Sequence, residues 1–296
     1  MTAFAEASIA MGAGKQDWLA IWRQMYDAER AQTDAVAPPM REPAGDHWAS
    51  QAARFAQATG RPAQPDHFMR LVLPYLQPSD TVLDIGAGAG RHAVYLAQQV
   101  ARVVAVEPSD SMRAQLERRL VEAHGINLTI VPERWPEADV PTCDVAICAH
   151  VLYGVREIGP FLVRMDAIAH RACFILLGYR QPAYYINPFW NRVYGAPRAP
   201  LPGALECLNV LRQLGIAAQL THLPASRYTF ANEREALADL HWRLRLPSES
   251  AHDSILHVAM RDLLDRSTDG QLMPQNQPSH VAALWRETAV KQCIRS

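Results

Sequence analysis

Residues 81–90 read Thr81-Val-Leu-Asp-Ile-Gly-Ala-Gly-Ala-Gly90, an apolar stretch that runs directly into three glycines spaced two apart. This pattern predicts a buried strand followed by a tight turn. Glycine lacks a Cβ atom, so such a turn can take unusual backbone angles and let a ligand approach the backbone closely. The residues after Gly90 are expected to open a helix, whose free N–H groups and positive dipole end would face that ligand. The stretch therefore predicts a nucleotide-type ligand site.

A second strand with an acid at its end follows about twenty residues later, which is the spacing found in nucleotide-binding α/β folds. It reads Val103-Val-Ala-Val-Glu107. A carboxylate in this place can accept hydrogen bonds from both ribose hydroxyls. Glycine turns after strands also occur for purely structural reasons, and the pairing with Glu107 favours the ligand site.

The spacing of the glycines bears on which nucleotide is bound. Dinucleotide folds favour G-x-G-x-x-G, because a pyrophosphate rests on the helix that follows. Here Gly90 falls only two residues after Gly88, and Asp84 precedes the turn. A carboxylate beside a diphosphate is unfavourable, whereas it suits a cation such as the ammonium of an amino-acid moiety.

These two stretches, together with Val106-Glu-Pro-Ser-Asp-Ser-Met112, resemble the first two motifs of the class I S-adenosylmethionine-dependent methyltransferases. The resemblance covers residues 80–177. It implies an α/β, Rossmann-like, seven-stranded, mostly parallel sheet with an antiparallel last strand, S-adenosylmethionine as the methyl donor and S-adenosylhomocysteine as the product. The residues that it places at the cofactor are Asp84 at the amino group, Gly86, Ala87, Gly88 and Gly90 under the methionine part, Glu107 on the ribose, and Pro108 and Met112 near the adenine.

The family commonly has a third cofactor element after the third strand, where this chain reads Pro132-Glu133-Arg134-Trp135. By this resemblance, Glu133 would accept from the adenine amino group, with Arg134 beside it. Trp135 would cover the adenine ring, although plain packing is an equally good interpretation of a tryptophan in a loop.

The chemistry is expected at the end of the fourth strand, in Cys148-Ala-His150-Val-Leu-Tyr153. Methyl transfer from a sulfonium is an in-line displacement, so the protein has to align the reactants and, for an acidic nucleophile, accept a proton. His150 and Tyr153 are the candidate catalytic residues, and His150 also counts as a cofactor neighbour. The alternative is that His150 orders the loop by a backbone hydrogen bond and Tyr153 covers the cofactor.

Short apolar runs alternate with helical segments after Asp80, which is typical of β-α-β units and a parallel sheet. The expected strands are 81–85, 102–106, 127–131, 144–149, 172–177, 217–223 and 281–285, with a further extended stretch at 228–230. The expected helices are 15–33, 47–58, 65–78, 91–99, 110–124, 156–170, 205–214, 233–245 and 251–266.

Three regions are predicted: an N-terminal helical cap (1–79) with a proline-rich linker at 37–45, the cofactor-binding core (80–180), and an aromatic-rich insert with added helices and the closing strands (181–296). Aromatic side chains concentrate in the added regions and suggest helical lid additions over the substrate. A satellite hydrophobic core is the alternative, and it is the favoured role for the helix that carries Trp18 and Trp22.

Composition narrows the function classes. The net charge is -1, and 20% of the residues are charged and 49% hydrophobic, so nothing indicates nucleic acid. No signal peptide or membrane span is recognised, and five cysteines without a C-x-x-C pair favour a cytoplasmic compartment. Histidine spacing offers no metal site, and the odd offset from Cys143 to Cys148 predicts opposite strand faces.

The leading hypothesis is a methyltransferase that acts on a small molecule, with the oligomeric state open. A nicotinamide-dependent oxidoreductase and a non-catalytic S-adenosylmethionine-binding protein are the alternatives.

Overall fold

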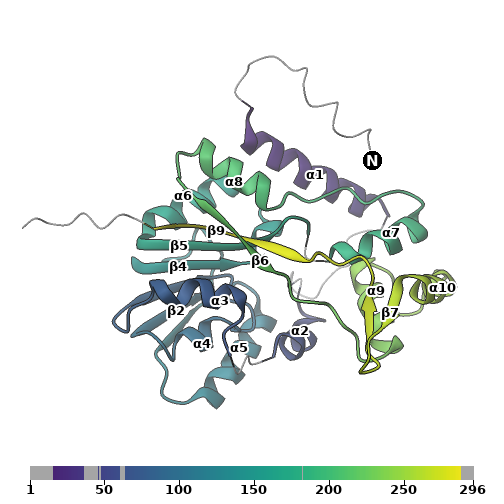
Figure 1. Ribbon diagram of the computed structural model, residues 1–296, viewed down its shortest axis with the longest axis horizontal. Helices are drawn as coiled ribbons and strands as arrows, with labels where there is room; N and C mark the ends of the chain where they lie inside the picture. Colours follow the sequence, from purple (N-terminus) through teal and green to yellow (C-terminus); the bar gives the residue numbers. More distant parts are fainter. Residues whose placement is uncertain (1–15, 37–45, 47, 61–63, 182, 288–296) are drawn as a thin grey trace, which may run out of the picture.

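A seven-stranded sheet forms the centre of the molecule in the computed structural model, which describes residues 16–36, 46, 48–60, 64–181 and 183–287 (Figure 1). The strand order is β3-β2-β1-β4-β5-β9-β6. The first five strands run parallel, and β9 is antiparallel to both of its neighbours. The strands are β1 (Thr81–Ile85), β2 (Arg102–Val106), β3 (Leu128–Val131), β4 (Cys143–Ala149), β5 (Ala169–Gly178), β6 (Gln219–Pro224) and β9 (His280–Glu287). The predicted α/β sheet with its antiparallel closing strand is confirmed.

Helices cover both faces of the sheet, because strands in the middle of a parallel sheet are apolar on both sides. One face carries α1 (Trp18–Val36), α6 (Ile158–Ile168) and α8 (Ala204–Gln213). The other face carries α3 (His67–Val72), α4 (Ala93–Leu96) and α5 (Asp110–Ala123). Leu83 and Ile85 of β1 pack into the first layer and Val82 into the second, as the two-residue period of a strand requires.

The three N-terminal helices pack on different parts of the protein. Trp22 of α1 is fully buried against the α6 and α8 side, and its Nε1 donates to the Val155 carbonyl at 2.8 Å. Helix α3 belongs to the opposite layer, and the short helix α2 (Ala52–Thr59) packs on the turn after β1 through Ala52 and Ala56. Helix α1 therefore has the packing role that its tryptophans favoured, and α2 alone lies over the glycine turn.

A third hydrophobic cluster lies beside the sheet and holds the inserted elements (Figure 1). Tyr185, Phe189 and Trp190 are buried in it, so these aromatic residues form a satellite core. Its elements are η4 (Tyr184–Ile186), α7 (Asn187–Tyr194), α9 (Glu233–Arg243), α10 (Asp253–Leu263), and a two-stranded sheet of β7 (Leu264–Arg266) and β8 (Leu272–Pro274).

Several predicted bounds were wrong for identifiable reasons. The helix expected at 251–266 ends at Leu263, because the turn at Gly270 brings β8 back to pair with residues 264–266. The helix expected at 91–99 is only α4, since Gln98 and Gln99 bond to the third residue before them in a tightened turn. Helix α3 passes at Leu73 into the 3₁₀ turn η2 (Leu73–Tyr75), which contains a proline.

The extended stretch expected at 228–230 pairs through a single residue, and the prediction for the two cysteines was wrong. The stretch 228–230 makes only one isolated bridge, from Phe230 to Leu272. Cys143 and Cys148 lie in the same hydrophobic layer, because the pairing of β4 with β5 shifts between Cys143 and Val145 and turns Cys143 to the other side. Predictions for the linker at 37–45 fall outside the described residues.

Candidate functional site

The carboxyl ends of three strands bring the sequence motifs together at one edge of the sheet. Ile85, the last residue of β1, lies opposite Val106 of β2 and Cys148 of β4. Because parallel strands end at the same edge, the glycine turn, Glu107 and the loop that starts at His150 are neighbours. We call this place the carboxyl edge.

The glycine turn is held tightly against β2 but open on its other side. Gly86, Gly88 and Gly90 have φ angles of 71°, 56° and 81°, in the left-handed region that favours glycine. The N–H groups of Gly86 and Ala87 both donate to the Val106 carbonyl, at 2.8 and 3.1 Å. A Cβ at Gly86 would collide with Val151, whereas a Cβ at Gly88 would meet no atom within 4 Å. Gly88 is therefore where a ligand can approach the backbone.

Glu107 binds this turn directly. Its Oε2 accepts from the Gly88 N–H at 2.7 Å and its Oε1 from the Ser109 N–H at 2.8 Å. Burial raises the pKa of Glu107, while these two hydrogen bonds act in the opposite direction. Each oxygen keeps a second lone pair, so the carboxylate can still accept from a ligand hydroxyl.

Asp84 is a second buried carboxylate at the carboxyl edge. Burial raises its pKa to about 6; His92 lowers it and the neighbouring Glu107 raises it further. Two carboxylates held together in a dry site repel each other, and a cation placed between them would relieve that repulsion. The pair is poorly suited to a pyrophosphate and well suited to a ligand that carries an ammonium or sulfonium charge.

An ion network that sequence reasoning missed connects α3 to the glycine turn. Asp66 caps α3 by accepting from the Met69 N–H at 2.8 Å, and its other oxygen lies 2.9 Å from Arg91 Nη2 and 3.0 Å from His92 Nε2. Burial opposes ionisation of Asp66, but His92, Met69 and Arg91 together hold its pKa well below the usual range. His92 is 26 residues from Asp66 in the sequence, so no local pattern predicts this network.

His150 adopts a backbone conformation that is uncommon for a residue with a side chain. Its φ is 60°, and its N–H donates to the Leu176 carbonyl at 2.9 Å. Strained residues of this kind concentrate at functional sites. More than a third of the residue is accessible to water, yet desolvation by the surrounding protein, followed by His92 and Arg91, lowers its pKa to about 4. The imidazole is therefore neutral at physiological pH.

Tyr153 lies beside His150 and has a structural bond of its own. Its hydroxyl accepts from the Gly178 N–H at 2.5 Å and lies 3.5 Å from His150 Nδ1. Burial raises the pKa of the phenol, so it stays protonated. The Tyr153 hydroxyl can thus donate its proton toward His150 while it fixes the end of β5, and both predicted residues occupy the carboxyl edge.

Helix α2 is joined to the carboxyl edge by a residue that the sequence did not single out. Asp46 accepts from the Ser109 hydroxyl at 2.8 Å, from the Ser111 N–H at 2.9 Å and from the Trp48 N–H at 3.0 Å. Burial alone would raise the pKa of Asp46, but these hydrogen bonds lower it to about 2. Asp46 thereby anchors the segment before α2 to the start of α5.

The third predicted cofactor element, residues 132–135, combines exposed charged side chains with one buried tryptophan. Glu133 is exposed and accepts from the Asp139 N–H at 2.8 Å, and Arg134 is exposed. Trp135 is buried, and its Nε1 donates to the Phe161 carbonyl at 3.1 Å. This contact favours the packing interpretation of Trp135.

Pro108 and Met112 differ in their surroundings. Pro108 is exposed beside Glu107. Met112 is buried against α2 and Ala89. The adenine contacts of both residues stay predictions.

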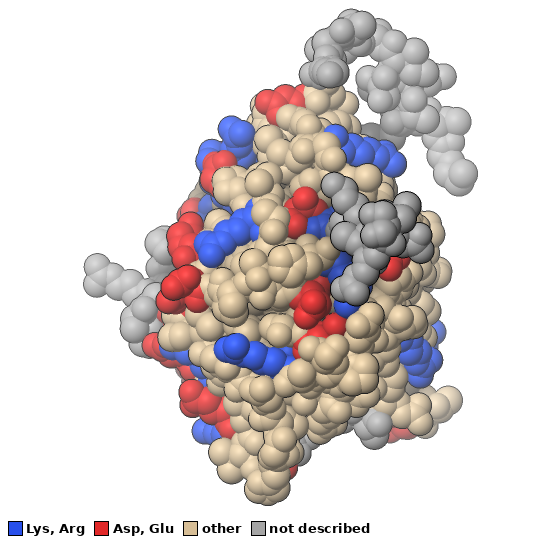
Figure 2. Space-filling view, turned by 90° about the vertical axis from the view of Figure 1, so that its left-hand side faces the viewer, with Lys and Arg blue, Asp and Glu red and all other residues tan. Residues whose placement is uncertain are grey.

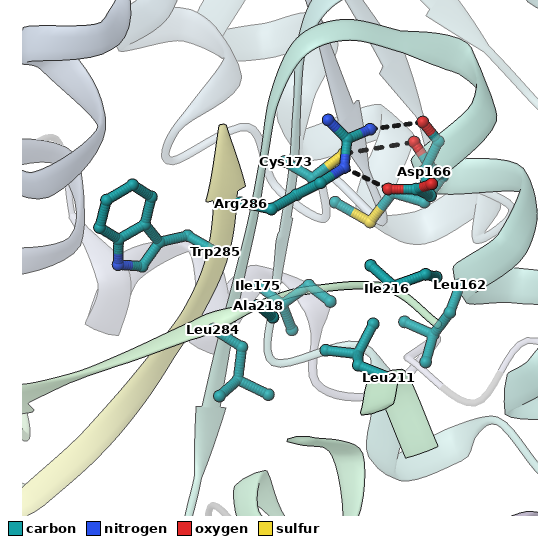
Figure 3. A pocket seen from close by; sticks show the side chains of 11 residues that line it. Leu162, Asp166, Cys173, Ile175, Leu211, Ile216, Ala218, Leu284, Trp285 and Arg286 are labelled. Carbon is teal, nitrogen blue, oxygen red and sulfur yellow. Dashed lines mark hydrogen bonds and ion pairs between the residues drawn. The ribbon is translucent and has the colours of Figure 1, made fainter. Parts of the chain in front are cut away.

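A small apolar pocket lies elsewhere, between the sheet and helices α6 and α8 (Figure 3). Its lining includes Leu162, Cys173 and Leu211, and Arg286 bonds to Asp166 at its rim. Asp166 is near the end of α6 that leads into the start of β5, so the pocket is remote from the carboxyl edge. A ligand bound in this pocket would therefore not contact the glycine turn.

The described ranges contain neither a metal-binding cluster nor a membrane-spanning helix. They contain no group of three or more His, Cys, Asp or Glu side chains that could hold a metal ion. None of the helices described is long and apolar enough to cross a bilayer.

Comparisons with known proteins agree with this geometry. Residues 82–166 match the model of a family described as "Methyltransferase domain". An uncharacterised protein of Haemophilus influenzae is 27% identical over 210 residues, covering 68% of this chain and 76% of the relative. A "Probable dimethyladenosine transferase" of Dictyostelium discoideum is 31% identical over 100 residues, covering 33% of this chain and 30% of the relative.

A solved structure from Bacillus halodurans C-125, assigned to the methyltransferases, has the same fold. It superposes with a TM-score of 0.50 at 11% identity and covers 74% of this chain and 97% of its own. The matched domain spans the glycine turn, the acid after β2 and the loop after β4, which are the parts that form the carboxyl edge. Residues 82–166 of this chain therefore match a methyltransferase domain, and the chain has the fold of the solved methyltransferase structure.

Proposed function

We propose that this protein transfers a methyl group from S-adenosylmethionine to a small-molecule acceptor at the carboxyl edge. The observation that carries the proposal is the juxtaposition of an open glycine, Gly88, with two buried carboxylates and a neutral histidine on adjacent strand ends. When bound, the cofactor supplies a methyl group activated by a sulfonium charge.

The residues present fit this cofactor. Gly88 leaves room for a ligand against the backbone, and Glu107 keeps lone pairs for ribose hydroxyls. Asp84 supplies negative charge for the amino group, and its raised pKa reflects the cost of ionising a buried carboxyl, to which Glu107 adds. The same two carboxylates argue against a nicotinamide dinucleotide.

His150 and Tyr153 are proposed to face the acceptor. A neutral imidazole can accept a proton, and its exposed position leaves it accessible at the carboxyl edge. If Tyr153 donates to Nδ1, then Nε2 carries the ring hydrogen and serves as a donor to the acceptor molecule. In the other tautomer Nε2 carries no hydrogen and can accept a proton from the acceptor molecule. Depending on the tautomer, the imidazole therefore either positions the acceptor or removes its proton.

A small acceptor is favoured over nucleic acid by two features, the covered glycine turn and the near-neutral net charge of -1. Helix α2 packs over the glycine turn and restricts access to it from the side of Ala89 and Met112. Figure 2 shows the side on which β9 ends and the parallel strands begin, opposite the carboxyl edge, and basic and acidic side chains are mixed there. Nucleic-acid binding usually depends on clustered Lys and Arg.

Calorimetry and a product screen test the proposal. S-adenosylhomocysteine and S-adenosylmethionine should bind, and the nicotinamide dinucleotides should not; the reverse result would refute the cofactor assignment. The protein is then incubated with methyl-labelled S-adenosylmethionine and either a panel of small acids, phenols and amines or total RNA. Label in a small-molecule product supports the proposal, whereas label only in RNA, or none despite cofactor binding, contradicts it.

A further inference from the structure

Asp239, on α9, is at the centre of a buried cluster of charges that the proposed methyl transfer leaves unexplained. It is 1% exposed and accepts hydrogen bonds from Arg54 of α2, from the Tyr185 hydroxyl, and from Arg243 Nε, the last at 2.8 Å. One buried carboxylate thus faces two guanidinium groups. A buried carboxylate is balanced by one cation, so this cluster carries an additional positive charge.

Arg54 has an unused donor in this cluster. Its Nη2 binds Asp239, but its Nη1 is buried and has no hydrogen-bond partner in the described part of the chain. Buried guanidinium N–H groups are normally paired, so an unpaired one calls for an acceptor. Glu235 acts on Arg54 through space, but its Oε2 accepts from the Ala231 N–H instead. The missing acceptor is therefore expected to be a group that none of the described residues supplies.

The cluster lies next to the proposed reaction site. Arg54 belongs to α2, whose Ala52 and Ala56 pack against Ala89 of the glycine turn, and α2 and α9 are neighbours in Figure 1. Arg243 lies over the Tyr228 ring, with 5.5 Å from its Cζ to the ring centroid. The Tyr228 phenol in turn acts electrostatically on Tyr153. The cluster thus adjoins the glycine turn through α2, and its Arg243 adjoins Tyr228 of the inserted region.

On the basis of the proposed methyl transfer, we infer that Arg54 binds a carboxylate of the acceptor, so that the substrates are small organic acids. The planar guanidinium, fixed through Nη2 by Asp239, directs Nη1 at that carboxylate. The two arginines, Asp239 and one singly charged carboxylate together are neutral. A phosphate dianion would leave excess negative charge and would need more donors than Nη1. Arg54 acts here as a residue that determines specificity.

Ligand-observed NMR on the protein saturated with S-adenosylhomocysteine tests this inference. Benzoate is the probe, benzamide its neutral match and phenyl phosphate the phosphate control. Benzoate should bind at least tenfold more tightly than benzamide and more tightly than phenyl phosphate. Equal binding of benzoate and benzamide would overturn the inference, and tighter binding of phenyl phosphate would overturn the carboxylate assignment.

Substitutions locate the binding group. Arg54→Gln should weaken benzoate at least tenfold, whereas Arg192→Gln, which removes an exposed ion pair to Asp262, should leave it unchanged. Both should keep the wild-type affinity for S-adenosylhomocysteine. If Arg54→Gln loosens α2 so that S-adenosylhomocysteine no longer binds, Arg54→Lys is the deciding variant. Its ammonium keeps the ion pair to Asp239 but does not supply Nη1, so the affinity for benzoate should still fall about fivefold. Unchanged benzoate affinity in Arg54→Lys then overturns the inference, whereas failure of the wild type to bind S-adenosylhomocysteine counts against the proposed function.

Discussion

Glu107 accepts a hydrogen bond from the backbone N–H of Gly88 at 2.7 Å, so the acid that ends β2 holds the turn that follows β1. Its other oxygen holds Ser109, the N-cap residue of α5. One carboxylate therefore shapes the turn, fixes the next helix and remains able to meet a ribose hydroxyl. A change at Glu107 should affect both the stability of the fold and cofactor binding.

Glu107→Gln is the first test of this dual role. The glutamine amide presents N–H groups to one of the two backbone donors, so one charge-assisted hydrogen bond is lost and one donor is left unpaired. We expect the free energy of unfolding and the binding free energy of S-adenosylhomocysteine each to fall by about 1–3 kcal/mol. Denaturant unfolding and calorimetry measure the two effects. Glu117→Gln, on the exposed side of α5, is the control, and an unchanged cofactor affinity in Glu107→Gln would refute its role.

The three glycines of the turn should respond differently to alanine. All have positive φ, which costs a residue with a side chain about 1 kcal/mol. Gly86→Ala adds a collision with the stiff Val151 side chain, worth a further 1–3 kcal/mol or so. Gly88→Ala meets open space. We therefore expect Gly86→Ala to lose more stability than Gly88→Ala, and Gly88→Ala to remain folded but to lose cofactor affinity.

Thermal unfolding and calorimetry of these two variants provide the comparison. Equal destabilisation by the two alanines would show that the collision at Gly86 is relieved by movement of Val151. Unchanged cofactor affinity in Gly88→Ala would mean that the ligand does not approach the backbone there.

The core of the fold could be predicted from sequence because its signals are local. The β1 and β2 bounds were predicted to the residue, since short apolar runs bounded by a glycine turn and by an acid leave little freedom. The register of parallel strands then places the glycine turn, Glu107 and His150 together without any further information.

The rest depended on contacts between residues far apart in the chain. Asp46 and Asp66 look like ordinary surface acids until α2 and α3 fold onto the carboxyl edge. The ion pair from Arg54 to Asp239 joins segments 185 residues apart, and no periodic pattern in the sequence predicts it. Trp135 appeared in a loop, and only the approach of α6 gave its indole nitrogen a partner.

The raised pKa of Asp84 predicts a specific pH dependence of stability. Its pKa is about 6 in the folded protein against an ordinary 3.8, so the folded state resists ionisation of this group. The penalty is absent below pH 4 and complete above about pH 6. Asp84→Asn should therefore gain about 2–3 kcal/mol relative to wild type between pH 4 and pH 7, in the absence of cofactor. Unfolding by urea across this range measures the difference, and a constant difference would contradict the assignment.

Cofactor binding should reverse that penalty by releasing a proton. A ligand ammonium beside Asp84 favours the ionised carboxylate, so S-adenosylhomocysteine should bind with proton release near pH 6. Calorimetry in two buffers of different ionisation enthalpy detects the released proton as a buffer-dependent heat. Asp84→Asn should bind more weakly and without this dependence. Proton release that persists in Asp84→Asn would assign it to another group.

His150 and Tyr153 should separate catalysis from cofactor binding. His150→Asn preserves a side chain that tolerates a φ of 60°, so the fold should remain intact, whereas His150→Val should destabilise it by about 1–2 kcal/mol or more.

With an acceptor from the labelled-methyl screen, His150→Asn should lower turnover at least tenfold and change S-adenosylhomocysteine affinity less than threefold. Because desolvation by the surrounding protein lowers the pKa of His150 to about 4, the wild-type rate should not fall on acidification to pH 5 through protonation of this ring. Tyr153→Phe leaves the buried Gly178 N–H unpaired and should cost about 1–3 kcal/mol of stability. If these variants instead lost cofactor affinity and retained turnover, His150 and Tyr153 would serve the cofactor rather than the acceptor.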